Sequence, residues 1–596
     1  MKILLIAINA KYIHSNLAVY GLKAYVDAGN HGCGLQACAD TGSPTDGLQA
    51  CTGGSDADIS AAQVEIAEYT INHLRETILA DLYRKKPDIA AFSCYLWNIE
   101  YVRALIPELK QVLPEVRIWV GGPEVSYDSG LFLQEFPQVE LVMNGEGEET
   151  FRELVLGADP AGTAGITWRD KRGRICVNPS RPLLSMDELP FMYQDLTAFQ
   201  NRIIYYESSR GCPFSCSYCM SSIDKRVRFR SVSLVKEELQ FFLDHGVPQV
   251  KFVDRTFNCR HSHAMEIWRY IKEHDNGITN FHFEISADLL NEEELALLNS
   301  FRPGLAQLEI GVQSTNPRTL EAISRNADFS KIVRAVCRVQ QGQNIHQHLD
   351  LIAGLPYEDL ESFRRSFNDV YALKPQQLQL GFLKVLKGSG MHEKAEEFGI
   401  VYRARAPYEV LKSGWISYED LLKLKSVEEM VEVYYNSSQF AHTMEYLEPL
   451  FPDAFSMYES LAAFYEEKGY TGQSHSRMGR LNILREFALE VPGCSRAVCE
   501  DCLLYDLYLR ENSKSRPEWA GSPCKEKDAV YAFYQKEARE HRYLKYEEPY
   551  QARQLMHMTH LEIFSDGAWV LFDYRRRNPL NGDAAVCRVS CPDPEG

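Results

Sequence analysis

The chain has 596 residues, of which 45% are hydrophobic and 24% are charged, and its formal net charge at pH 7 is −18. This length exceeds what a single hydrophobic core usually serves, so we expect about three to four domains. The acidic balance argues against a nucleic-acid-binding protein, because such proteins usually carry a basic surface.

Strands alternate with helices in the first 155 residues. Continuous apolar runs predict buried strands at 1–8, 89–94, 116–121 and 139–143, and helices are predicted at 73–85 and 99–113. This alternation is typical of a parallel sheet covered on both faces, so we expect an α/β domain over residues 1–155. An insertion at 29–60, rich in Gly, Ser, Thr and Asp, interrupts the pattern and predicts a flexible loop. Its three cysteines (Cys33, Cys38 and Cys51) could bind metal, although this composition does not build a rigid site.

Three further regions follow along the chain. Residues 156–200 are predicted to form a linker with a hairpin around residues 171–173. From 201 to 395 the alternation resumes, with candidate strands at 203–208, 249–254, 280–286, 305–311, 346–353 and 378–385. Six such units predict a partial (β/α)6 barrel of the TIM type, with its chemistry at the carboxyl ends of the strands. Residues 396–596 are predicted to be a mainly helical domain, with helices at 418–435, 455–468 and 528–543 and a β-like tail at 560–574.

A cysteine motif follows the first candidate barrel strand. In SSRGCPFSCSYCM (208–220), Cys212, Cys216 and Cys219 have C-x3-C-x2-C spacing. Thiolates are the ligands of iron–sulfur clusters, and three of them leave one iron of a [4Fe-4S] cluster open, whereas structural zinc usually takes four protein ligands. We recognise no secretory signal and no run of roughly 20 apolar residues that could cross a bilayer, so we expect a cytoplasmic, reducing setting. Clustered cysteines then indicate metal binding, and the alternative of three buried thiols fits this loop position poorly.

The motif resembles that of the radical S-adenosylmethionine (SAM) superfamily. The resemblance implies that Cys212, Cys216 and Cys219 hold the cluster and that the open iron chelates the amino and carboxylate groups of SAM. It also implies that Tyr218 packs near the adenine. In that family an electron from the cluster cleaves SAM, and the resulting 5′-deoxyadenosyl radical takes hydrogen from the substrate. A reductant such as flavodoxin or ferredoxin is then an expected partner.

Later strand ends match the superfamily in order and spacing. In KFVDRTFN (251–258), which lacks the usual GGE-like string, the resemblance implies Asp254 as a contact of the SAM amino group. In FEIS (283–286) it implies that Glu284 binds the ribose, although a buried polar residue without that role is the alternative. It implies further SAM-binding positions at Gln313 and Ser314 in LEIGVQS, and at Gly354 in LDLIAGLP.

The N-terminal domain resembles cobalamin-binding domains. Their pattern, D-x-H-x-x-G, then S-x-L, then GG, is matched here by His14 in YIHSNL, by Ser93 in FSCYLW and by Gly121–Gly122. The acid and the glycine of the first motif are replaced by Tyr12 and Leu17, so the usual partner that orients the histidine is lost. The resemblance implies that cobalamin binds at the switch point of the sheet, with His14 as a cobalt ligand or as a solvated loop histidine. GEGEETF (145–151) closes the domain much as in cobalamin-binding radical SAM proteins.

A second cysteine group, Cys494, Cys499 and Cys502, lies in the C-terminal third. It could hold zinc or an auxiliary cluster, with Cys524 as a fourth ligand, or it could be free thiols on a helix that begins near Ala497.

Together the two resemblances favour a cobalamin-dependent radical SAM enzyme that methylates an unactivated carbon of a small molecule or peptide. The alternatives are a radical cyclisation or rearrangement without methyl transfer, and a non-catalytic cobalamin or cluster sensor. Methylthiolation is disfavoured, because its N-terminal three-cysteine cluster and basic tail are absent from the sequence.

Overall fold

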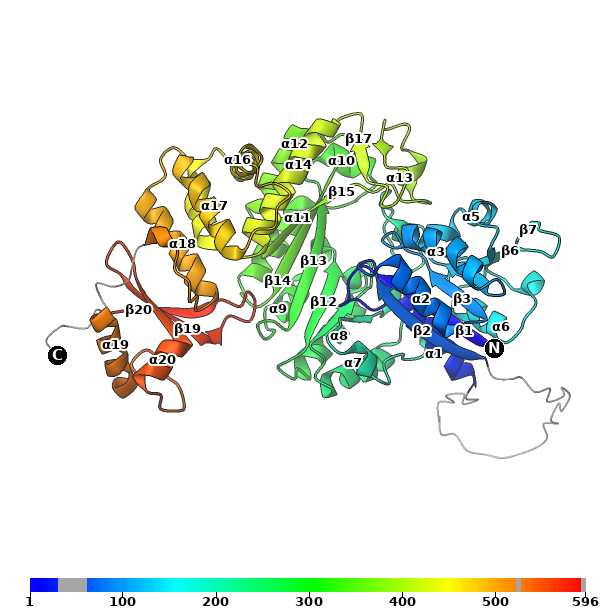
Figure 1. Ribbon diagram of the computed structural model, residues 1–596, viewed down its shortest axis with the longest axis horizontal. Helices are drawn as coiled ribbons and strands as arrows, with labels where there is room; N and C mark the ends of the chain where they lie inside the picture. The colour runs from blue at the N-terminus through cyan, green and yellow to red at the C-terminus, as the bar shows by residue number, and fades with distance from the viewer. Residues whose placement is uncertain (31–61, 521–526, 591–596) are drawn as a thin grey trace. The chain divides into compact units, whose positions relative to one another are not determined.

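The computed structural model describes residues 1–30, 62–520 and 527–590 (Figure 1). Nearly all of the insertion at 29–60, with Cys33, Cys38 and Cys51, lies outside the described residues, as does Cys524. The chain forms two compact units. The first comprises Met1–Arg255, Lys384–Glu397 and Tyr402–Val410, and the second comprises Thr256–Leu383, Phe398–Val401 and Leu411–Gly596.

A seven-stranded sheet forms the centre of the first unit. Its strands lie in the order β2 (Gln63–Thr70), β1 (Lys2–Asn9), β3 (Ile89–Ser93), β4 (Arg117–Gly121), β5 (Val139–Met143), β6 (Ile166–Arg169) and β7 (Ile175–Val177). The first five are parallel, as the continuous apolar runs predicted, and the last two are antiparallel. The hairpin expected in the linker is therefore part of this sheet. Strand β2 was not predicted, because QVEIAEYT alternates in polarity and directly follows the insertion.

Helices cover both faces of this sheet. Helices α1 (Leu17–Asn30) and α6 (Glu148–Val155) pack on one face, over a core that includes Trp119 and Phe151. The other face is covered by α2 (Arg75–Lys85), α3 (Ile99–Val112) and α5 (Ser129–Glu135), and a short helix, α4 (Pro123–Ser126), follows β4. Strand β2, which follows β1 in the chain, lies on one side of β1, and β3, which comes next, lies on the other side. The carboxyl ends of β1 and β3 thus form the switch point at which doubly wound sheets bind ligands.

The first unit also contains the beginning of the predicted barrel. Strands β8 (Ile204–Tyr206) and β11 (Gln249–Phe252) are parallel and are connected through α7 (Val232–Asp244). Between β8 and α7, β9 (Ser209–Arg210) pairs with β10 (Arg228–Phe229). The cysteine motif lies in the segment of chain that connects these two paired strands. A short helix, α13 (Gly390–Glu393), belongs to the same unit.

The second unit begins with the other four predicted barrel strands. These are β12 (Asn280–Ile285), β13 (Ala306–Gln313), β14 (His346–Ala353) and β15 (Gln377–Phe382), and neighbours along this order pair in parallel. The intervening helices are α8 (His261–Glu273), α9 (Glu292–Leu298), α10 (Pro317–Ala322), α11 (Phe329–Gln340) and α12 (Leu360–Tyr371). All six predicted barrel strands are present, so the strand–helix alternation expected of a partial (β/α)6 barrel is confirmed.

The C-terminal region is mainly helical, as expected. After two short strands, β16 (Val401–Tyr402) and β17 (Val410–Lys412), come α14 (Tyr418–Val431), α15 (Ala441–Leu447), α16 (Ala454–Glu467), α17 (Arg477–Glu490), α18 (Arg496–Arg510), α19 (Lys527–Glu540) and α20 (Ala552–Met558). The β-like tail is an antiparallel sheet of β18 (Thr559–Ile563), β19 (Trp569–Arg577) and β20 (Ala584–Val589).

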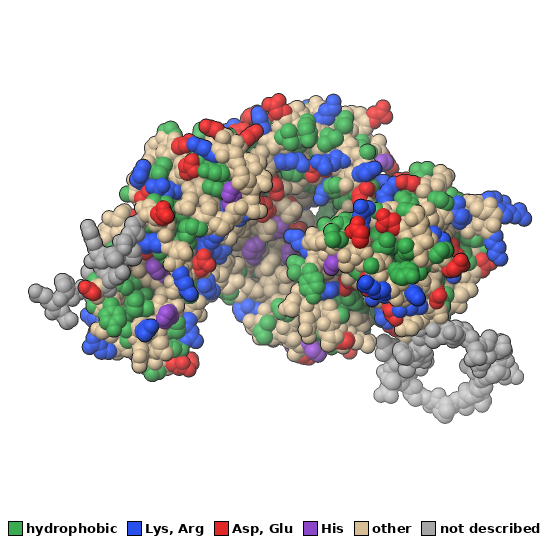
Figure 2. Space-filling view, viewed as in Figure 1, with side chains coloured by type: hydrophobic (Ala, Val, Ile, Leu, Met, Phe, Trp, Pro, Cys, Tyr) green, Lys and Arg blue, Asp and Glu red, His purple; other side chains and the backbone are tan. Residues whose placement is uncertain are grey.

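Two surface properties bear on possible partners. Within the described part of the chain, no helix is both long and apolar enough to cross a membrane. Basic and acidic side chains are interspersed on the face shown in Figure 2.

Candidate functional site

The cysteine motif forms a tightly held loop in the first unit. Cys212 and Cys216 are buried, and Cys219 is partly buried. Gly211 adopts φ +96°, and a Cβ there would lie 2.5 Å from the carbonyl oxygen of Arg226, so the loop requires glycine at this position. The amide of Cys219 donates to the carbonyl of Cys216 (3.1 Å). Cys216 and Cys219 therefore lie on one turn of a loop that also carries Cys212, and three thiolates are a donor set that an iron–sulfur cluster takes.

Two further contacts brace this loop. The amide of Cys212 donates to the carbonyl of Asp224 (3.1 Å), and the amide of Met391, at the start of α13, donates to the carbonyl of Ser217 (2.7 Å). A segment far along the chain therefore supports the cysteine loop within the same unit.

Asp254 follows β11, and its side chain contacts the two serines that precede the cysteine motif. Its fully buried carboxylate accepts hydrogen bonds from the amide and hydroxyl of Ser208 (3.0 and 2.7 Å) and from the hydroxyl of Ser209 (2.5 Å). Burial raises the pKa of Asp254, and the serine hydrogen bonds oppose that shift. The structure thus assigns this carboxylate a role in fixing the strand-to-loop transition, while its contact with SAM stays a prediction.

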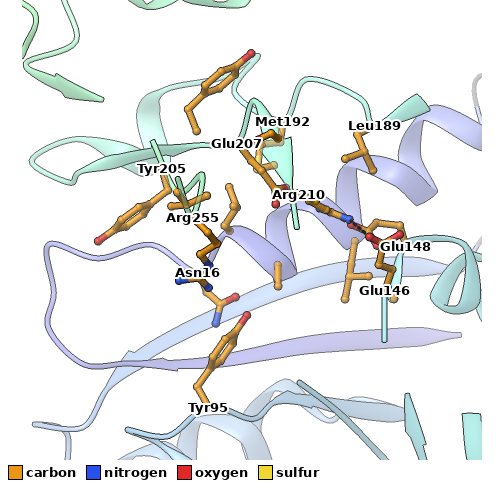
Figure 3. Close-up of a pocket in the computed structure, with 18 of the residues that line it drawn as sticks. Asn16, Tyr95, Glu146, Glu148, Leu189, Met192, Tyr205, Glu207, Arg210 and Arg255 are labelled. Atoms are coloured by element: carbon orange, nitrogen blue, oxygen red, sulfur yellow. Dashed lines mark hydrogen bonds and ion pairs between the residues drawn. The ribbon is translucent and has the colours of Figure 1, made fainter. Parts of the chain in front are cut away.

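A cavity of about 810 Å³ lies next to the loop in the first unit (Figure 3). Residues that follow β1, β3 and β5 line it, together with residues of β8 and its C-terminal continuation and with Gly211 and Met220, which flank the cysteine motif. The cavity is therefore bordered both by the switch point of the first sheet and by residues that flank the cysteine motif. Tyr95 and Trp97, which line it after β3, stack with ring centroids 4.6 Å apart and provide a flat aromatic surface.

His14 lines this cavity and has a partner that sequence reasoning missed. Its Nδ1 lies 2.5 Å from the hydroxyl oxygen of Tyr205, on β8. Burial, followed by the charges of Lys11 and Lys251, lowers the pKa of His14, so the imidazole is neutral near pH 7. Tyr205 thus gives the His14 imidazole a hydrogen-bond partner from a distant segment of the chain. No local motif pointed to this residue, because it lies in another predicted domain.

The other residues of the cobalamin pattern have different environments. The hydroxyl of Ser93 accepts a hydrogen bond from the side-chain amide of Asn16 (3.1 Å). Gly121 lines the cavity. Gly122 adopts φ +113°, and a Cβ there would lie 2.4 Å from the carbonyl oxygen of Cys94. Gly122 therefore permits close packing of the ends of β3 and β4, next to the cavity.

An ion-pair network forms another wall of the cavity. Arg210 lies 2.8 Å from Glu207, 2.7 Å from Glu148 and 3.4 Å from Glu146, measured between side-chain nitrogen and oxygen atoms (Figure 3). These carboxylates raise the pKa of Arg210 against the opposing effect of burial. Burial raises the pKa of Glu207, and Arg210 opposes that shift. The GEGEETF segment is therefore bound to the strand that precedes the cysteines, a role that its sequence did not predict.

The remaining SAM-binding candidates lie in the second unit, apart from Tyr218, which is partly buried in the cysteine loop. Glu284 is partly buried on β12, and Gln313, at the end of β13, has φ +72°. The hydroxyl of the buried Ser314 donates to Glu358 (2.6 Å), and burial raises the pKa of Glu358 to about 7. Gly354 has φ +88°, which its position after β14 requires. The ligand roles of these residues stay predictions.

The C-terminal cysteines lie near the start of α18. Cys499 is buried on the helix, Cys502 is partly buried one turn later, and Cys494 precedes the helix. Burial raises the pKa of Cys499, and it raises that of Cys502 to about 12. Burial thus favours thiols over thiolates here, and metal binding by this group stays a prediction.

Three families match successive parts of the chain. The B12 binding domain matches residues 3–155, the radical SAM superfamily matches residues 206–370, and a protein family of unknown function (DUF4080) matches residues 396–575.

Several curated relatives match about half of this chain. An uncharacterized methyltransferase of Pyrococcus horikoshii is 28% identical over 313 residues, covering 50% of this chain and 67% of that protein. The cobalamin-dependent radical SAM methyltransferase TokK of Streptomyces tokunonensis is 27% identical over 344 residues, covering 53% and 50% of the two chains. An anaerobic magnesium-protoporphyrin IX monomethyl ester cyclase of Rubrivivax gelatinosus is 22% identical over 302 residues, covering 47% and 54%. The chain thus spans about half to two thirds of the length of these curated relatives.

A solved structure shares the fold over more of the chain. The cobalamin-dependent SAM radical enzyme OxsB with aqua-cobalamin bound superposes with a TM-score of 0.57 at 14% identity, covering 85% of this chain and 80% of that one. The fold and the site define a protein in which a cobalamin-type domain precedes a radical SAM core. In its two matched domains the chain resembles cobalamin-binding radical SAM enzymes, and these domains imply a [4Fe-4S] cluster, SAM and cobalamin as cofactors.

Proposed function

We propose that this protein methylates an unactivated carbon of a small-molecule or peptide substrate in a cobalamin-dependent radical reaction. One observation carries the proposal: a cavity within the first unit is bordered by the switch point of the B12-type sheet and by residues that flank the cysteine motif. Methyl transfer by two cofactors requires them to reach the same substrate, and a shared cavity provides that access.

The size and the lining of the cavity suit a corrin. Its volume of about 810 Å³ lies toward the upper end of ligand pockets, which span roughly 300–1,000 Å³. Tyr95 and Trp97 offer a flat apolar surface, and Gly121 lets the backbone approach a ligand. His14, kept neutral by burial, is the residue we assign to the cobalt, with Tyr205 orienting its ring.

The chain's own residues prepare the site. When bound, the cluster and SAM supply a radical that takes hydrogen from the substrate, and cobalamin supplies a methyl group that a second SAM replaces. Cys212, Cys216 and Cys219 would hold the cluster, and Asp254 fixes the strand end from which they project. Arg210 binds three glutamates, so this wall of the cavity is held by charge-assisted contacts. A low-potential reductant such as flavodoxin or ferredoxin would supply the electron.

The test is anaerobic incubation of the reconstituted protein with hydroxocobalamin, dithionite, SAM carrying a labelled methyl group, and a metabolite extract. We expect corrin absorbance that stays with the protein, formation of 5′-deoxyadenosine, and label in a new product. The Cys212→Ala/Cys216→Ala/Cys219→Ala variant should form no 5′-deoxyadenosine, and Cys337→Ala, which changes an exposed cysteine on α11, should behave as the parent. If the reconstituted protein retains no corrin, the methylation proposal is wrong.

A second candidate function is a radical cyclisation or rearrangement with the same cofactors. The likeness to a magnesium-protoporphyrin ester cyclase favours it. The labelled methyl group distinguishes the two, because a cyclisation product would contain no label. A sensor without catalysis would bind corrin and produce no 5′-deoxyadenosine.

A further inference from the structure

Three side chains on two neighbouring strands of the second unit converge on one point. Glu309 lies on β13, and His348 and Asp350 lie on β14. One ligand atom from each lies within 4.8 Å of the others. Among the described residues, this is the one group of three or more His, Cys, Asp or Glu side chains that meets this distance.

The strand register explains why these residues meet. Glu309 pairs with His348, and Gly311 pairs with Asp350, in the parallel ladder between β13 and β14. Burial alternates along both strands, with Leu308 and Leu349 fully buried and the three polar residues partly exposed. Gln347 points the other way, because its side-chain amide donates to a carbonyl of α11 (3.2 Å). The three residues therefore share the face of the sheet opposite to α11.

The neighbouring strand adds a supporting contact. His282 on β12 places its Nε2 2.9 Å from a carboxylate oxygen of Glu309. His348 Nε2 lies 3.0 Å from Asp350 Oδ1. The side chains of His282, Glu309, His348 and Asp350 are between 12% and 22% exposed. This face is thus a polar, half-buried surface, whereas the interiors of such barrels are usually packed with branched apolar side chains.

Two carboxylates so close together in a partly desolvated place repel each other unless positive charge lies between them. Two carboxylate oxygens and one imidazole nitrogen are a donor set for divalent first-row metal ions, since imidazole suits zinc and iron and carboxylate suits manganese. An outer residue that contacts a ligating side chain, as His282 contacts Glu309, is a common feature of metal sites.

We propose that Glu309, His348 and Asp350 bind one divalent cation of the zinc or manganese type, with His282 orienting Glu309. This site involves none of the three cysteines of the cluster motif, and it does not depend on the methylation proposal. Its open coordination positions would accept water or an oxygen or nitrogen atom of a ligand.

The first test measures the metal content of the full-length protein after cluster reconstitution and incubation with Zn²⁺, followed by removal of free metal. We expect about one Zn per chain beyond the iron of the cluster. His348→Gln and Glu309→Gln should lose that ion, and His282→Ala should weaken its binding about 10- to 100-fold, as is typical for an outer-shell partner. His274→Ala, which changes an exposed histidine next to α8, and Glu293→Gln, which changes an exposed acid on α9, are the matched controls and should retain it.

Co²⁺ binding to the Cys212→Ala/Cys216→Ala/Cys219→Ala variant then reports the ligand type without cluster absorbance. Nitrogen and oxygen ligation gives weak visible bands, whereas binding at Cys494, Cys499 and Cys502 would add strong thiolate charge-transfer absorbance in the near ultraviolet. Circular dichroism identifies any variant that fails to fold, and Asp350→Asn then serves in its place. The proposal is overturned if the parent protein takes up no zinc, if the ligand variants bind zinc as the parent does, or if cobalt shows thiolate bands only. The first of these results would mean that protonated His282 and His348 neutralise the carboxylates instead.

Discussion

Replacing Gly122 with alanine should loosen the end of the B12-type sheet. The residue has φ +113°, and an added Cβ would lie 2.4 Å from the carbonyl oxygen and 3.1 Å from the amide nitrogen of Cys94. Both atoms are backbone, and the amide of Cys94 is itself bonded to the carbonyl of Gly121 (2.7 Å), so the neighbour cannot rotate away. A non-glycine residue in such a conformation costs about 1–3 kcal/mol, and forcing packed backbone apart costs a similar amount. We therefore expect a loss of about 2–6 kcal/mol in local stability.

Gly121→Ala is the matched control. A Cβ at Gly121 would lie 3.5 Å from Met143, an ordinary contact, and no positive φ is involved. Its effect should therefore stay below about 1 kcal/mol in either direction. The two variants differ by one position in the chain, so composition and helix propensity do not distinguish them.

Hydrogen exchange followed by mass spectrometry measures this difference where it occurs. Peptides that cover β3 and β4 should exchange at least about thirtyfold faster in Gly122→Ala than in the parent, because each 1.4 kcal/mol is a factor of ten in the opening equilibrium. Peptides from β13 and β14 should not change. Equal exchange rates of the two variants in β3 and β4 would refute the steric argument.

Three further predictions concern charge and cluster binding. Glu358→Gln should raise the free energy of unfolding above pH 7. The pKa of Glu358 in the folded protein, about 7, lies above the usual value of 4.5, so the stability that the protonated carboxyl contributes is complete below pH 4.5 and is lost by about pH 7. This change is on the order of 3 kcal/mol, and urea unfolding of parent and variant at several pH values would measure it. A parent whose stability does not fall between pH 4.5 and 7 relative to the variant would contradict this. For His14 the sign is opposite, because its pKa in the folded protein lies below 6.5: the stability that the neutral imidazole contributes is complete above pH 6.5 and is lost as the pH falls. Lys251→Met should raise the pKa of His14 in a histidine NMR titration. An unchanged pKa would exclude the charge of Lys251 as a cause of the shift. Cys219→Ala should reduce the iron and sulfide retained after reconstitution to a small fraction of the parent value, and full retention would show that Cys219 is not a cluster ligand.

Four strands of the first sheet and the cysteine motif could be predicted because their signals are local. Apolar runs of strand length located β1, β3, β4 and β5, and C-x3-C-x2-C spacing after a strand located the cluster motif. Strand β2 was missed because its half-exposed edge position produces no continuous apolar run.

The contacts that shape the cavity could not be predicted, because they join segments distant in the sequence. Tyr205 reaches His14 across 191 positions, and Arg210 reaches Glu148 across 62. Only folding brings the first sheet and the strand before the cysteines together, so neither the partner of His14 nor the ion pairs of Arg210 leave a local pattern. Asp254 was identified as a residue of interest, and its burial beneath Ser208 and Ser209 became visible only in three dimensions.

The support that α13 gives to the cysteine loop has a consequence for biogenesis. Ser217 emerges from the ribosome long before Met391, and at about 5–20 residues per second the interval is roughly ten to thirty-five seconds. During that time the three thiols are displayed on a nascent chain whose brace has not yet been synthesised. Cluster delivery to this enzyme is therefore best timed after translation has passed α13, and a fragment that stops at Arg255 would present the cysteines without the segment that holds them in place.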